Sequence, residues 1–476
     1  MAARGAMSVE VASTGGAEAR AVREGWPAGR LAWVTVGCLA VVQFLCAIDR
    51  HLINLLIGPI KKDLGVSDSS MGLLALSFAV LYALMGIVAG RGADSYVRKA
   101  IIAIGVTVWS AMTVAFGLAR TLGQLFLTRM GVGAGEATLN PNGYSLIADY
   151  FPPEKRAKPM GIFIMGSTLG QAFTLFAGGA LIQYLMKNNI TWTMPWGGEL
   201  KPWQIAFVCA GAPGFLIALM VLAIREPERR EMLEVRGDGA VALRPRRVSL
   251  AEVGRFYVRH VRLYVPIYLG FGLILMWELG KQLWFPSFLA RTYGWQPAQI
   301  GAALGLLTLI FSSAGTASAG WVAEWLAKRG YRDAYMRAAF IAAILALPVC
   351  VLAPQMPTAT LSLVLFAPAC YLGTFPFALA PATLSTITPN QMRAQITALY
   401  LATVNLLGAG LGPLYIGTLT DHVFHDEKLL KYSLSVTAAT VLPLAMLMLK
   451  LAMREYVRHL DAAQDQQLGK PKMRDG

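Results

Sequence analysis

The sequence carries little charge for its length. Only 14% of its 476 residues are Asp, Glu, Lys or Arg, whereas 56% are hydrophobic, and the mean hydropathy is +0.52. A water-soluble protein of this length needs far more charge to cover its surface. The composition therefore excludes an ordinary soluble protein and indicates a chain that lies in a lipid bilayer.

Cysteine and histidine are also scarce. The chain has five of each, and its cysteines lie in apolar runs without paired spacing, which predicts neither a disulfide framework nor a zinc site. The glycines from Gly131 to Gly135 lie inside an apolar run with no strand before it, so they are not a dinucleotide fingerprint. We find no nucleotide-binding loop, no nucleophile with its base and no signal-peptide pattern. We therefore expect no enzyme activity and no cofactor.

What the chain does have is a series of long apolar runs. A helix of roughly 20 residues crosses a hydrocarbon core of about 30 Å, and we count about twelve runs of this length. They begin near Ala32, Ser70, Lys99, Leu122, Pro159, Trp203, Arg262, Ala298, Ala334, Thr358, Arg393 and Tyr432. The runs do not alternate as barrel strands do. The prediction is an all-α membrane protein with about twelve transmembrane helices, divided equally between two pseudo-symmetric bundles.

The basic residues are distributed unevenly between the connections. Roughly 30 Lys and Arg lie on the side of the termini and roughly 8 on the other side, which is the asymmetry of the positive-inside rule. This rule explains the net charge of +15 without nucleic acid. We expect a multi-pass protein of the cell (inner) membrane with both termini in the cytoplasm.

The polar segments predict five regions. These are a disordered N-terminal tail (1–30), a first bundle (31–225), a basic linker (226–260), a second bundle (261–454) and a C-terminal tail (455–476). Within the linker, the stretch from Leu250 to Arg259 can form an amphipathic helix on the cytoplasmic membrane surface.

A short signature occurs twice between apolar runs. Gly90, Asp94 and Arg98 have the same spacing as Gly320, Glu324 and Lys328. A second pair of connections, Pro153–Ala157 and Pro389–Ala394, is repeated in register. Membrane folds built from repeated halves are mostly transporters that move one half against the other. We interpret the signature residues as conformational gates, with Asp94 also able to cap the helix that follows.

A few charges lie inside the apolar runs, where each costs roughly 2.5–3.5 kcal/mol and usually marks an ion or substrate pathway. They are Asp49, Arg50, Arg129, Glu136, Glu278 and Lys281. Asp49 and Glu136 are candidate proton carriers, because Arg stays protonated. Arg50 and Arg129 are candidates to restrain them and to hold an anionic group of the substrate. The alternative is a structural cluster of ion pairs.

The second-half pair is open to two interpretations. Glu278 and Lys281 are three residues apart, close enough on a helix to pair with each other. They are either a mutually neutralised pair or a substrate contact.

These motifs resemble the major facilitator superfamily, and within it the spinster-like branch. The residues that carry the resemblance are Asp49-Arg50, Pro59 to Asp68, Met71 to Leu74, Arg129 to Ala137 and Trp284 to Leu289. The resemblance implies a central cavity lined by the first, fourth, seventh and tenth helices. It implies proton coupling through Asp49, Arg50, Arg129 and Glu136, and a monomer.

The resemblance also implies a substrate class. The expected function is proton-coupled secondary transport by rocker-switch alternating access, with an amphiphilic lipid such as a lysophospholipid or sphingoid as substrate. One alternative is a proton symporter of small organic anions such as sugar acids. The other, of a different class, is a non-transporting membrane receptor or enzyme.

Overall fold

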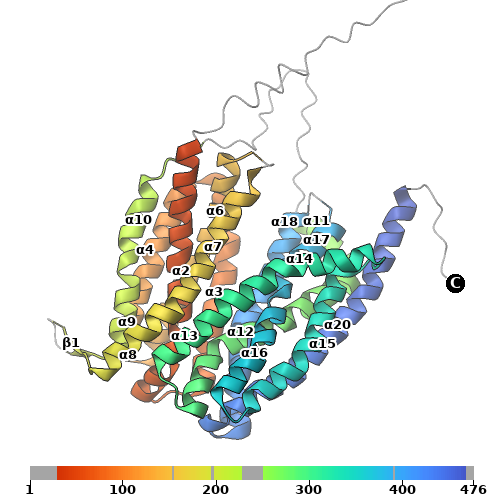
Figure 1. The fold of residues 1–476 in the computed structure, drawn as a ribbon. Coiled ribbons are helices and arrows are strands. Elements are labelled where there is room, and N and C mark those ends of the chain that lie inside the picture. The colour runs from red at the N-terminus through yellow and green to blue at the C-terminus, as the bar shows by residue number, and fades with distance from the viewer. Residues whose placement is uncertain (1–28, 153–154, 195–197, 228–249, 390–391, 468–476) are drawn as a thin grey trace, which may run out of the picture.

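The computed structural model describes residues 29–152, 155–194, 198–227, 250–389 and 392–467. In this part of the chain two helical bundles stand side by side and diverge toward one end (Figure 1). We call this the near end, where α2 (Gly29–Leu64) begins and α20 (Leu430–Gln467) ends. The opposite end is the far end.

The remaining elements follow in chain order. The first bundle continues with α3 (Asp68–Ser95), α4 (Arg98–Gly117), α5 (Leu122–Glu136), α6 (Leu139–Tyr150), α7 (Ala157–Phe173), η2 (Thr174–Gly178), α8 (Gly179–Lys187), β1 (Trp192–Thr193), β2 (Glu199–Leu200), α9 (Pro202–Gly211) and α10 (Pro213–Ala223). After α11 (Leu250–Arg259), the second bundle comprises α12 (Val261–Tyr293), α13 (Pro297–Leu307), η3 (Thr308–Ser312), α14 (Ser313–Lys328), α15 (Ala334–Leu352), η4 (Ala353–Gln355), α16 (Ala359–Gly373), α17 (Phe375–Ile387), α18 (Arg393–Val404), η5 (Asn405–Leu411), α19 (Gly412–Thr418), η6 (Leu419–Phe424), η7 (Glu427–Leu429) and α20.

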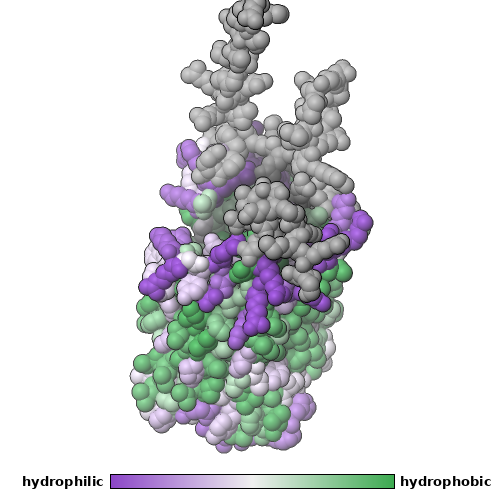
Figure 2. Space-filling model, turned by 90° about the vertical axis from the view of Figure 1, so that its right-hand side faces the viewer, coloured by the Kyte–Doolittle hydropathy of each residue, from purple (hydrophilic) through white to green (hydrophobic). Residues whose placement is uncertain are grey.

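The apolar runs form the predicted membrane helices. Eleven helical segments in the described residues are long and apolar enough to span a bilayer. The fourth predicted span is instead divided into α5 and α6 at Ala137 and Thr138. Pro141 lacks the N–H that would bond the carbonyl of Ala137 four residues earlier, which accounts for the break. Around these segments an apolar belt lies between two more hydrophilic ends (Figure 2). The chain is thus a multi-pass membrane protein.

Small residues let the bundles meet near the far end. A Cβ atom added to Gly72 of α3 would lie 2.6 Å from Cα of Leu414 on α19. One added to Gly179 of α8 would lie 2.6 Å from the carbonyl oxygen of Pro297 on α13. Only glycine permits such close approach of two helix backbones. The contacts form two seams, α3 against α19 and α8 against α13.

The predicted regions correspond to the elements as follows. The linker contains α11, whose Tyr257 ring packs 5.7 Å from the ring of Tyr264 and 5.7 Å from that of Tyr268, both on α12. At the C-terminus, α20 continues to Gln467, beyond the predicted bundle boundary at 454. Most of the predicted N-terminal tail (1–30) and most of the linker lie outside the described residues, and α2 already begins at Gly29.

Candidate functional site

The break between α5 and α6 leaves Glu136 at the end of α5, facing the middle of α2. Arg50 of α2 donates from Nε to Oε2 of Glu136 over 2.5 Å. The Glu136 side chain is fully buried, whereas the Arg50 side chain is 31% exposed. This ion pair therefore joins the first and fourth predicted spans and has one side open.

Asp49 and Arg129 lie beside this pair, and both residues are buried. Arg129 donates from Nη1 to the main-chain carbonyl of Asp49 over 3.3 Å. The Asp49 side chain is buried, with the Trp109 indole, the Thr113 hydroxyl and the Arg129 guanidinium near its carboxylate, and it makes no ion pair within 4 Å among the described residues. The four charges predicted to act together thus lie together, and Glu136 has an ion-pair partner whereas Asp49 has none among the described residues.

Two aromatic residues of α3 cover the cluster, and the sequence analysis did not single them out. The guanidinium carbon of Arg129 lies 4.6 Å from the ring centre of Phe78, and that of Arg50 lies 4.7 Å from the ring of Tyr82. Phe78 and Tyr82 are stacked at 5.7 Å. Cations over aromatic faces are stabilised without neutralising their charge. One helical turn separates the two rings, so a pattern of aromatics four residues apart was the available signal.

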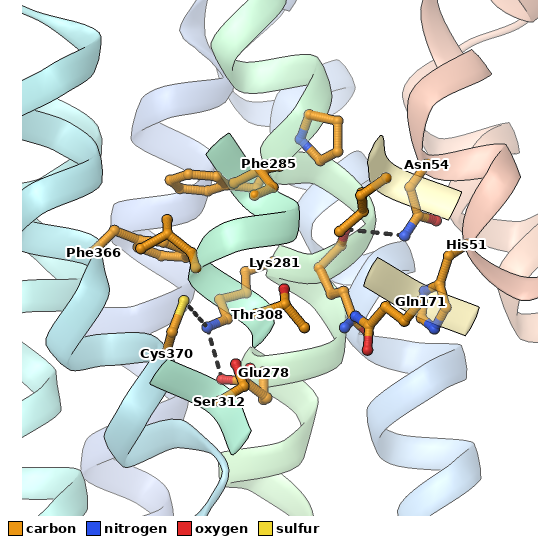
Figure 3. Close-up of a pocket in the computed structure, with 15 residues that line it drawn as sticks. His51, Asn54, Gln171, Glu278, Lys281, Phe285, Thr308, Ser312, Phe366 and Cys370 are labelled. Atoms are coloured by element: carbon orange, nitrogen blue, oxygen red, sulfur yellow. Dashed lines mark hydrogen bonds and ion pairs between the residues drawn. The ribbon is translucent and has the colours of Figure 1, made fainter. Parts of the chain in front are cut away.

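The second bundle holds the other predicted pair. Nζ of Lys281 lies 2.8 Å from Oε2 of Glu278, 3.8 Å from Sγ of Cys370 and 4.5 Å from the centre of the Phe366 ring (Figure 3). Both charged side chains are buried. Gly373 makes room for this arrangement, because a Cβ there would lie 3.0 Å from the carboxyl carbon of Glu278. The two residues do pair with each other.

A small pocket, with a cavity volume of about 40 Å³, opens between the bundles next to this pair (Figure 3). The first bundle lines it with α2, α7 and η2, and the second with α12, α13, η3 and α16. Its lining residues are His51, Asn54, Gln171, Leu175, Glu278, Lys281, Gln282, Phe285, Pro286, Leu304, Leu307, Thr308, Ser312, Phe366 and Cys370. The arginines Arg50 and Arg129 are not among them. Asn54 closes one wall by donating to the carbonyl of Gln282 across the bundles, over 3.2 Å.

At the near end, the signature base Arg98 is held inside the first bundle. It is buried and pairs with Asp149 of α6 and, at 2.8 Å, with Glu226 after α10. Glu226 also accepts hydrogen bonds from the backbone N–H groups of Arg98 and Lys99. The carboxylate at the start of α4 is therefore that of Glu226, and Val97 at the N-cap provides no side-chain bond. The side chain of Asp94, predicted for this capping position, lies outside the described residues.

The other signature residues are loosely surrounded. A Cβ atom added to Gly90 or Gly320 would meet nothing within 4 Å. The side chains of Glu324 and Lys328 on α14 are exposed. Their gating role stays a prediction.

An ionic network at the far end joins the two bundles, and the sequence analysis did not predict it. Asp68, at the start of α3, accepts two bonds from Arg291 of α12, over 2.6 and 2.8 Å, and pairs with Lys61. Lys61 also bonds Glu427 of the second bundle over 2.8 Å. Charges at the ends of spans are ordinary features of membrane helices, so nothing in the sequence marks these as partners.

The same network includes a cap that crosses between the bundles. Asp421 of η6 accepts hydrogen bonds from the backbone N–H groups of Ser69, over 2.5 Å, and of Asp68, over 3.3 Å. A carboxylate from the second bundle thus satisfies the free N–H groups at the start of a helix of the first bundle.

The chain matches the family model of the Major Facilitator Superfamily over residues 39–413. The chain belongs to the Major Facilitator Superfamily. Its members are membrane transporters and not enzymes. The fold, with two bundles and a pocket between them, agrees with this assignment.

Relatives indicate the branch. An MFS-type efflux pump of Mycolicibacterium smegmatis is 29% identical over 83% of this chain and 86% of its own length. A probable L-galactonate transporter of Escherichia coli is 27% identical over 61% of this chain and 60% of its own. The crystal structure of a bacterial homologue of the human lysosomal transporter spinster, in an inward-facing and unoccupied conformation, matches 91% of this chain and 99% of that chain with a TM-score of 0.77 and 25% identity. The chain is therefore a spinster-like member with similarity to sugar-acid transporters.

Proposed function

We propose that this transporter is proton-coupled and works by alternating access, with both termini in the cytoplasm. The far-end network and the two glycine seams hold the bundles together, while the bundles diverge toward the near end (Figure 1). With the near end at the cytoplasm, as the positive-inside rule requires, this conformation is open inward. Transport then requires the far-end contacts to break and contacts at the near end to form.

The carboxylate of Asp49, which is buried and makes no ion pair among the described residues, carries the proposal of proton coupling. A buried negative charge that no ion pair neutralises is costly, and taking up a proton removes that charge. Glu136 differs, because Arg50 already neutralises it at 2.5 Å. We assign Asp49 as the site that is protonated in this conformation, and Glu136 as the site that takes a proton when Arg50 moves away.

The substrate that we favour is an amphiphilic lipid such as a lysophospholipid or sphingoid. Leu175, Leu304, Leu307 and two aromatic rings, Phe285 and Phe366, make much of the pocket lining apolar. The two rings are stacked with their centres 3.8 Å apart. Such a surface suits an alkyl chain, and the spinster similarity supports the same class.

A second candidate is proton symport of small organic anions such as sugar acids. The similarity to galactonate transporters favours it, as does the polar side of the pocket formed by Asn54, Gln171 and Thr308. Both candidates use the same proton site and differ in what occupies the pocket.

The test is transport by the purified chain in liposomes that contain a pH-sensitive dye. Lysolipids, sphingosine and D-galactonate are added in turn, and the wild type is compared with Asp49→Asn and Glu136→Gln. We expect substrate-dependent proton movement in the wild type and its loss in both variants, while exchange of substrate without net proton movement persists. Coupled movement with D-galactonate alone supports the second candidate. Substrate accumulation that never changes pH, and that both variants retain, contradicts proton coupling.

A further inference from the structure

Lys281 is the feature of the pocket that proton coupling leaves unexplained. Its ammonium group has three N–H donors, and its side chain is only 3% exposed. Its neighbours are one carboxylate at 2.8 Å, a thiol at 3.8 Å, which is a weak acceptor, and an aromatic face at 4.5 Å. A buried ammonium group with a single strong acceptor has capacity for another.

The surrounding pocket supplies neutral hydrogen-bonding groups that are also free. The side chains of Gln171, Gln282 and Thr308 line it and make no side-chain hydrogen bond within the described residues. Figure 3 shows Gln171 reaching from the first bundle toward the side that holds Lys281 and Thr308. A ligand between them would contact both bundles, which is the position that an alternating-access substrate needs.

Glu278 cannot withdraw far from Lys281. The backbone of α16 at Gly373 lies directly behind its carboxylate, so close that even a methyl group would not fit there. A ligand therefore reaches the ammonium from the pocket side while Glu278 stays behind it. Arg50 is paired with Glu136 and does not line the pocket. Among the described residues that line it, Lys281 is the one Lys or Arg side chain.

We infer that Lys281, while it stays paired with Glu278, binds the carboxylate or phosphate of an anionic amphiphile as a second acceptor. The amide groups of Gln171 and Gln282 and the Thr308 hydroxyl bind the rest of the headgroup, and the apolar chain lies against Phe285 and Phe366. The inference rests on the proposed transport function and narrows its substrates to anions, which excludes cationic sphingoids.

The test compares ligands that share one oleoyl chain. Dissociation constants of oleoyl lysophosphatidate, which is anionic, and monooleoylglycerol, which is neutral, are measured with the purified full chain in detergent. Sphingosine and D-galactonate serve as a cationic amphiphile and as an anion without a chain. We expect the wild type to prefer lysophosphatidate over monooleoylglycerol at least tenfold, and Lys281→Gln to abolish the preference. Lys187→Gln, at the exposed end of α8, is the matched control and keeps it.

A second variant separates ligand binding from a structural role of the pair. Glu278→Gln removes the negative charge that repels an anionic ligand and keeps the cation, so it should bind lysophosphatidate several-fold more tightly than the wild type. A purely structural pair predicts weaker binding in both variants. Because Lys281→Gln leaves a carboxylate buried alone, the double variant Glu278→Gln/Lys281→Gln is measured as well, and it should also lack the preference.

The outcomes separate the inference from the function on which it rests. Retention of the preference in the folded double variant, equal affinity of the wild type for all ligands, or tighter binding of sphingosine overturns the anion site. Proton-coupled transport in liposomes can still be observed in each of these cases. Binding of D-galactonate that depends on Lys281 supports the anion site and identifies a small acid as its occupant.

Discussion

At the scale of single residues, Arg98 shows how one repeated signature serves two environments. In the first bundle this base is 1% exposed and joins Asp149 and Glu226. At the equivalent position of the second bundle, Lys328 is exposed at the end of α14. The repeat therefore preserves the position in the sequence but not the partners.

This difference predicts unequal effects on stability. Arg98→Gln removes the partner of two acids, and breaking a buried ionic network costs about 3–5 kcal/mol. Lys328→Gln changes an exposed residue and should alter stability by less than about 0.5 kcal/mol. Thermal unfolding of the two variants in detergent measures both effects. Equal unfolding temperatures would show that the Arg98 network contributes nothing and that its role is confined to another conformation.

At the scale of elements, the first turn of α3 depends on the other bundle. Asp421 binds the N–H groups of Asp68 and Ser69, and hydrogen bonds to a charged group contribute about 1.5–3 kcal/mol each. Opening of the far end must break these bonds. The start of α3 therefore reports whether the far end is closed.

Asp421→Asn should weaken that closure. The Asn amide carries no charge, so we expect hydrogen exchange at Asp68 and Ser69, whose N–H groups bond Asp421, to become at least tenfold faster, as measured by mass spectrometry of the membrane protein in lipid nanodiscs. Asp426→Asn is the control, because the Asp426 carboxylate bonds only the local N–H of Lys428 among the described residues. Similar exchange in the two variants would contradict a cap that holds the bundles together.

At the scale of the whole molecule, the two glycine seams determine how the bundles meet. Gly72→Val places side-chain atoms where the α19 backbone lies, whereas Gly86 of the same helix has nothing within 4 Å of an added Cβ. We expect Gly72→Val to reduce liposome transport at least tenfold, because the far end no longer closes, and Gly86→Val to remain near the wild type. The amount of protein inserted in the membrane is the control for folding. Normal transport by Gly72→Val would mean that the seam is not part of the cycle.

The sequence predicted the architecture better than the contacts between its parts. Apolar length and the duplicated signature were sufficient for two bundles, because membrane helices must satisfy their own backbone. The first-bundle cluster was also predictable, because Arg129 and Glu136 share one face of a helix and charged residues inside membrane helices usually pair with one another. Glu226 as the partner of Arg98, and Asp421 as a cap for α3, were not predictable. These pairs are distant in sequence, and each residue alone looks like an ordinary charge at a membrane surface.

The start of α3 has a further property. Asp421 caps it from the second bundle, and Ser67 caps it from within the first bundle. The Ser67 hydroxyl oxygen accepts a hydrogen bond from the N–H of Ser70, over 3.1 Å. The helix thus carries a resident cap next to the one lent by the other bundle. When Asp421 departs, the terminus still has a side-chain acceptor and need not unravel. The far end can therefore open while the first turn of α3 keeps one of its two caps. This helix terminus then does not have to refold in each transport cycle.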